Sequence, residues 1–223
     1  MKIAALIVAL ACAGLIGCVT APFPAPDPFV AGQEPQAGVP ARFAARLAPS
    51  FEQVNALVFR FKLHDMAALG VASVDLPTRS FAATCMTPLG VKLFDVVCSG
   101  GRVEGRFVHP ELAKRGGDLA QAAGADLTRA YLDWQPPERT PHAVRDGRLV
   151  FSAADATGVT EYRYAWRDGR LAEKIRFEKG RRLWSVEYRA YASGDGGLIP
   201  TGIVIANRQY GYRLVVSTRE EKR

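Results

Sequence analysis

The chain has 223 residues, of which 48% are hydrophobic and 23% are charged. Its 29 Lys and Arg residues outnumber its 22 Asp and Glu residues, which gives a formal net charge of +7. Acidic residues are interleaved with the basic ones, without the Lys/Arg block that is typical of a nucleic-acid patch, so we expect a solvated basic surface and no nucleic-acid partner.

Residues 1–17 have the pattern of a lipoprotein signal peptide. Lys2 supplies the positive charge, and the apolar run Ile3–Ala13 has the usual length of a signal peptide but is too short to span a bilayer. The lipobox Leu15-Ile16-Gly17-Cys18 follows. We therefore expect export, cleavage before Cys18 and acylation of the Cys18 thiol, with palmitate as a typical acyl group. The alternative is an ordinary secretory signal with a cysteine there by chance.

Residue 19 bears on the location of the mature protein. In many Gram-negative bacteria an Asp at this position retains a lipoprotein in the inner membrane, and this chain has Val19 instead. We therefore expect a lipid-anchored protein at the periplasmic face of the outer membrane. Residues 18–41 form a tether, because closely spaced prolines exclude a helix and regular strand pairing; these are Pro22, Pro24, Pro26, Pro28, Pro35 and Pro40.

Residues 42–223 are long enough for one domain with a sizeable core. A short helix is expected within 41–53, where Phe43, Leu47 and Phe51 are spaced by four residues. From Asn55 the apolar period becomes two, which indicates a half-buried strand. Further strands are expected at 67–74, 80–87, 91–99, 102–108, 147–153, 160–167, 171–178, 183–191, 202–206 and 210–218.

One amphipathic helix interrupts the strands. An apolar stripe runs between Gly117 and Pro136, from Leu119 to Trp134, and Asp118 is its expected N-cap. Short connections such as Asp168-Gly169 and Lys179-Gly180 predict hairpins, and so an antiparallel meander. The expected fold is mainly β (α+β): an open or incomplete antiparallel barrel of about ten strands with a covering helix.

Two cysteines, Cys85 and Cys98, remain in the mature chain besides Cys18. A tight hairpin through Pro88–Gly90 would place Cys98 roughly 20 Å along the strand from the position opposite Cys85. A disulfide requires Cα atoms less than about 7 Å apart. We therefore expect two buried, unpaired thiols.

Several stretches resemble the LolA/LolB family of outer-membrane lipoprotein carriers and receptors. They are the hairpin Thr87-Pro88-Leu89-Gly90, the helix Leu127–Trp134, the hairpin from Ile175 to Tyr191, and the closing strands Ile199–Ile205 and Tyr212–Val216. Together they cover most of the chain from Asn55 to Thr218. The resemblance implies an open barrel with a helical lid and an apolar cavity for acyl chains. It also implies that Leu89 protrudes and contacts the membrane; the alternative is that Leu89 folds back onto the sheet.

These features predict a monomeric, non-enzymatic protein that receives or transfers lipoproteins or lipids, with acylated cargo and a periplasmic lipoprotein carrier as partners. No cofactor or metal is expected, and the three histidines, His64, His109 and His142, form no catalytic pattern. We expect His109 and His142 in loops. Eight inward-facing aromatic residues are candidates for the cavity wall: Phe59, Phe61, Phe94, Tyr162, Tyr164, Trp166, Trp184 and Tyr188. The alternatives are plain core packing of these residues, a specialised relative with another cargo, and a structural or assembly lipoprotein that docks a partner of an envelope export or biosynthetic system.

Overall fold

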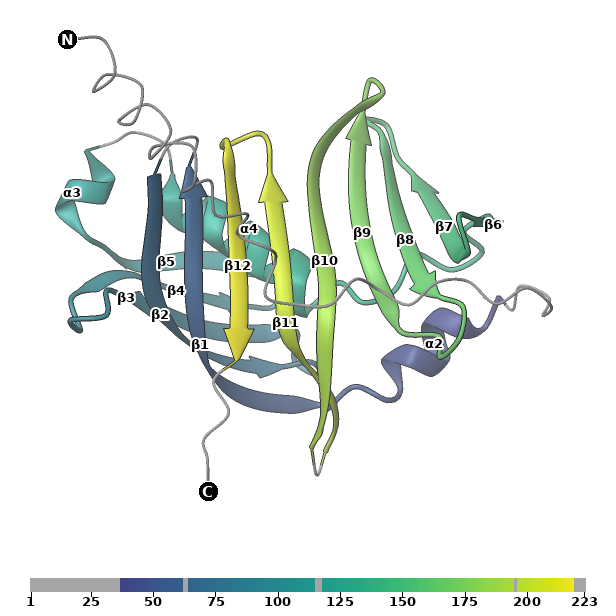
Figure 1. The fold of residues 1–223 in the computed structure, drawn as a ribbon, viewed down its shortest axis with the longest axis horizontal. Coiled ribbons are helices and arrows are strands. Elements are labelled where there is room, and N and C mark those ends of the chain that lie inside the picture. Colours follow the sequence, from purple (N-terminus) through teal and green to yellow (C-terminus); the bar gives the residue numbers. More distant parts are fainter. Residues whose placement is uncertain (1–36, 62–63, 115–117, 195, 219–223) are drawn as a thin grey trace, which may run out of the picture.

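The computed structural model describes residues 37–61, 64–114, 118–194 and 196–218 (Figure 1). The expected signal peptide, Cys18 and most of the tether lie outside these ranges. Within them, no helix is long and apolar enough to cross a membrane.

One antiparallel sheet of twelve strands dominates the described residues. Its order is β5-β4-β3-β2-β1-β12-β11-β10-β9-β8-β7-β6, so two meanders meet where β1 pairs with β12. The strands are β1 (Ser50–Phe61), β2 (His64–Asp75), β3 (Ser80–Met86), β4 (Lys92–Ser99), β5 (Arg102–Val108), β6 (His142–Arg145), β7 (Arg148–Ala154), β8 (Val159–Ala165), β9 (Leu171–Glu178), β10 (Arg181–Gly194), β11 (Gly197–Asn207) and β12 (Tyr212–Thr218). This confirms the expected open antiparallel sheet with few helices.

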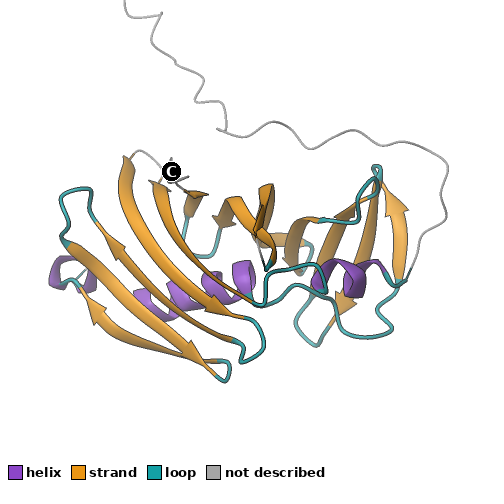
Figure 2. Ribbon diagram, turned by 90° about the horizontal axis from the view of Figure 1, so that it is seen from below, coloured by secondary structure: helices purple, strands orange, loops and turns teal. Residues whose placement is uncertain are grey.

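The sheet is strongly curved, and the helices α2 (Val39–Ala44) and α4 (Leu119–Tyr131) lie on its inner side (Figure 2). The short α3 (Pro110–Ala113) and α4 connect the two edge strands, β5 and β6. Asp118 caps α4, as expected, because its carboxylate accepts a hydrogen bond of 2.9 Å from the backbone N–H of Gln121. Helix α4 packs on β4, β5 and β11. It therefore covers the concave face of the first meander.

Strand β6 is absent from the sequence-based prediction, and the expectation that His142 lies in a loop is wrong. His142 begins β6 and pairs with Phe151 of β7. Asp146 and Gly147 connect the two strands with positive φ angles of 47° and 71°, which fits a two-residue hairpin turn. This Asp-Gly pair is the signal that could have identified the additional strand.

The predicted helix over 41–53 is too long. Helix α2 ends at Ala44, and Phe51 already belongs to β1, which begins at Ser50. Pro49 disfavours a helical conformation at the residue before it, which separates the two elements. Likewise, α4 ends at Tyr131, so Trp134 lies beyond the helix that was expected to include it.

The two described cysteines are buried and free, as expected. Cys85 of β3 pairs with Phe94 of β4, and Cys98 pairs with Phe81. The two cysteines are therefore not opposite each other in the β3–β4 pair, but lie at different positions along the strands.

Candidate functional site

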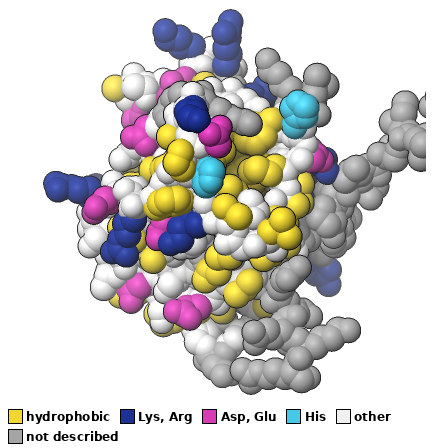
Figure 3. Space-filling model, turned by 90° about the vertical axis from the view of Figure 1, so that its left-hand side faces the viewer, with side chains coloured by type: hydrophobic (Ala, Val, Ile, Leu, Met, Phe, Trp, Pro, Cys, Tyr) yellow, Lys and Arg dark blue, Asp and Glu magenta, His cyan; other side chains and the backbone are white. Residues whose placement is uncertain are grey.

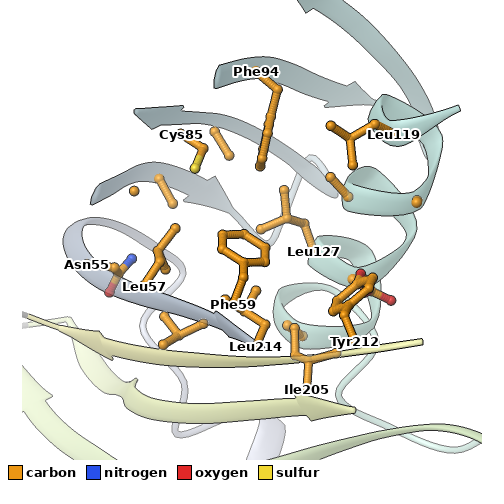
Figure 4. Close-up of a pocket in the computed structure, with 18 of the residues that line it drawn as sticks. Asn55, Leu57, Phe59, Cys85, Phe94, Leu119, Leu127, Ile205, Tyr212 and Leu214 are labelled. Carbon is orange, nitrogen blue, oxygen red and sulfur yellow. The ribbon is translucent and has the colours of Figure 1, made fainter. Parts of the chain in front are cut away.

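An apolar cavity of about 440 Å³ lies between α4 and the inner face of strands β1–β4, β11 and β12 (Figure 4). This volume is within the range of pockets that hold small ligands. Side chains from the sheet and from the helix form its wall, among them Leu57, Phe59, Phe94, Leu119, Leu127 and Leu214. The cavity can therefore bury an apolar chain but offers few hydrogen-bonding groups.

Phe59, Phe61 and Phe94, three of the eight candidate residues, line this cavity. The rings of Phe59 and Phe61 stack with centroids 6.3 Å apart, and both rings contact Tyr212. Phe61 is 41% exposed, and Tyr210, which also lines the cavity, is 48% exposed. These two residues therefore mark where the cavity opens to solvent.

On the end of the molecule that carries α3, hydrophobic side chains gather among charged ones (Figure 3).

The other five candidates lie in the second meander and are not part of the cavity wall. They are Tyr162, Tyr164, Trp166, Trp184 and Tyr188. Instead, two of them bind the chain at the end of α4. The Tyr164 hydroxyl donates to the backbone oxygen of Trp134 at 2.9 Å, and the Tyr188 hydroxyl donates to that of Ala130 at 2.9 Å. Residue alternation identifies the inner face of the strands, but it does not show which part of that face is filled by other segments.

Lys174 of β9 completes this contact with the end of α4. Its Nζ donates to the backbone oxygen of Asp133 at 2.7 Å and to that of Arg129. The Arg129 carbonyl, in the last turn of α4, has no partner within the helix itself. Lys174 is 1% exposed, and burial lowers the pKa of its amine to about 7. The sheet therefore fixes the C-terminal end of α4, and the cavity lies along the helix from Asp118 to Tyr131.

A buried carboxylate, Asp126, connects the middle of α4 to the sheet. It is 3% exposed and accepts hydrogen bonds from Arg129 at 2.6 Å, from Asn207 at 3.1 Å and from the Tyr212 hydroxyl. Burial and the neighbouring carboxylate raise the pKa of Tyr212, so its hydroxyl remains a donor. Asp126 is not among the site residues predicted from the sequence. The signal was an aspartate four residues after Ala122 on the apolar stripe of the helix.

The architecture can be compared with that of known proteins. No protein-family model and no curated protein matches the sequence. Three solved structures each cover 82% of this chain, with 90% of their own length matched. They are an outer membrane lipoprotein-sorting protein domain from Vibrio parahaemolyticus (12% identity, TM-score 0.52), a LolA superfamily protein from Nitrosomonas europaea (11%, 0.52) and a DUF1329 family protein from Desulfovibrio piger (8%, 0.51).

The chain has a LolA-like fold. This confirms the fold that the sequence resemblance implied. At these identities the likeness concerns the fold alone.

Leu89 is at the tip of the β3–β4 turn of this LolA-like sheet, and its side chain is 93% exposed. The backbone N–H of Gly90 donates to the Thr87 oxygen at 2.9 Å, and Gly90 has a φ of 84° that favours glycine. The turn therefore presents Leu89 to solvent, and the alternative in which it folds back onto the sheet is excluded.

The histidines of the LolA-like domain lie on separate elements. His64 begins β2, His109 caps α3 through its Nδ1 atom, and His142 begins β6. Among the described residues, no group of three His, Cys, Asp or Glu side chains could hold a metal ion.

Proposed function

We propose that this protein is an outer-membrane lipoprotein that binds acyl chains in the cavity under α4 and acts in the reception or transfer of lipoproteins or lipids. The cavity is the observation that carries the proposal. Acylated Cys18 anchors the chain at the periplasmic face, and the Pro-rich tether separates the folded domain from the membrane. The protein acts as a monomer, with a periplasmic carrier and its acylated cargo as partners.

Apolar burial supports acyl chains as the ligand. Each methylene removed from water contributes about 0.8 kcal/mol, so burial of ten carbons gains about 8 kcal/mol relative to a chain in water. The gain depends only on how completely each site buries the chain. Cargo therefore moves from a carrier to this cavity, or from this cavity to the bilayer, towards the site that buries it best. This process needs no catalytic group.

Leu89 supports contact with the membrane during this transfer. A fully exposed leucine at a turn contributes little to folding, whereas its insertion into a bilayer gains about 1.5–3 kcal/mol. Val91, in the same turn, is 49% exposed. We infer that this hairpin touches the bilayer when cargo leaves the cavity.

Leu89→Glu should reduce the transfer of a fluorescent acylated peptide to phospholipid vesicles by about tenfold or more. Binding of the peptide and the melting temperature should stay unchanged, because the side chain is exposed. Val144→Glu is the matched control. Val144 is an apolar residue that is 40% exposed on β6, the edge strand at the far end of the sheet from the β3–β4 hairpin. Transfer by Leu89→Glu at the wild-type rate would contradict the membrane-contact role.

A further inference from the structure

The charged side chains that line the cavity, among the described residues, are all acidic. Two ionisable carboxylates, Asp118 and Asp126, belong to the lining, and no lysine, arginine or histidine among the described residues does. An anionic group that enters an apolar site without a cationic partner loses its hydration without compensation. The described part of the wall therefore offers no cation to the carboxylate of a free fatty acid.

Arg129 is the cation that contacts Asp126 of the wall, and it is already engaged. Its guanidinium donates to Asp126 at 2.6 Å and lies 4.8 Å from the Trp184 ring centroid, in the second meander. Arg129 is not part of the cavity lining. It therefore compensates the buried Asp126 charge from outside the cavity and is not available to a ligand.

The N-terminus of α4 is the other feature of the wall that could attract an anion. Free backbone N–H groups and the helix dipole favour negative charge at such a position. Here Asp118 occupies it, since its carboxylate accepts the Gln121 N–H. The position is thus already filled by a negative charge of the protein itself.

We propose that the cavity selects acyl chains whose polar end is neutral or cationic, as in esters, amides and amines, and excludes free fatty-acid anions. This inference rests on the proposed acyl-binding function and specifies its ligand class. The aspartates act on specificity, whereas the affinity comes from burial of the chain.

The test is displacement of the neutral fluorophore N-phenyl-1-naphthylamine from the Cys18→Ala protein at pH 8. Three ligands with the same twelve-carbon chain are compared below their micellar concentrations: lauroyl glycerol, dodecylamine and laurate. The first two should displace the fluorophore at concentrations at least about tenfold lower than laurate. Equal displacement by all three would overturn the selectivity and leave the proposed function intact. Absence of fluorophore binding, or of displacement by any ligand, would contradict the proposed function and the selectivity with it.

Two variants test the role of the aspartates. Asp118→Asn retains a good N-cap, and Asp126→Asn retains an oxygen that can accept from the Tyr212 hydroxyl. In each, the ratio of the laurate concentration to the lauroyl glycerol concentration required for displacement should fall several-fold. Asp65→Asn, at an exposed position outside the cavity, is the control. If Asp126→Asn fails to fold, Asp118→Asn still decides the question, since an unchanged laurate deficit in it would contradict the assignment of Asp118.

Discussion

Replacing Phe43 by alanine should lower the free energy of unfolding by about 3–5 kcal/mol. Phe43 is the buried aromatic residue of α2 and is 2% exposed. Its ring makes edge contacts with Trp134, Tyr164 and Tyr191, with centroids 6.0, 6.1 and 5.7 Å apart. The substitution leaves a void beside residues that hold the end of α4, so the loss combines burial and packing.

Urea unfolding followed by tryptophan fluorescence measures this loss. Phe61→Ala is the matched control, because Phe61 is 41% exposed at the cavity opening and its removal should cost about 1 kcal/mol or less. Equal destabilisation by the two variants would mean that α2 does not form part of the core of the second meander.

Stability should rise between pH 7 and pH 9 because of Lys174. Its pKa is about 7 in the folded protein, against 10.5 for an ordinary lysine, mainly because burial disfavours the ammonium. Between these values the unfolded chain holds a proton that the folded protein releases, so the free energy of unfolding increases with pH. The expected increase from this group is about 2 kcal/mol over that window.

The comparison of wild type with Lys174→Met isolates this contribution. The difference in unfolding free energy between the two proteins should change by about 2 kcal/mol in favour of the wild type from pH 7 to pH 9. Lys114→Met, at the exposed position that follows α3, should leave the wild-type pH dependence intact. Parallel curves for wild type and Lys174→Met would show that the buried amine titrates outside this window.

Local patterns in the sequence predicted much of the fold. In β3, burial alternates strictly through Phe81, Ala83 and Cys85, and this matches the period of two. In α4, the apolar stripe and the Asp118 cap predicted both the helix and its first residue. These features depend on contacts between neighbours in sequence, or on a single buried face, which a periodic pattern expresses directly.

The division of the inner face could not be predicted in this way. Phe59 and Tyr188 both belong to strands in which apolar and polar residues alternate, and both were predicted to face inwards. Phe59 lines the cavity, whereas the Tyr188 hydroxyl donates to the backbone oxygen of Ala130. The difference depends on where α2 and the end of α4 lie across the sheet, which is a contact between distant segments. Asp126 was missed for the same reason, since its partners Asn207 and Tyr212 are more than 80 residues away.

Binding of N-phenyl-1-naphthylamine to a pair of α4 variants tests the acyl-binding cavity most directly. Ala123 lines the cavity, whereas Ala125 lies on the same helix outside the lining. Ala123→Phe should fill the space and abolish fluorophore binding and its displacement by lauroyl glycerol, while Ala125→Phe should bind as the wild type does. If Ala123→Phe binds the fluorophore as well as the wild type, the cavity is not the ligand site. The alternative of a structural or assembly lipoprotein that docks a protein partner would then be favoured.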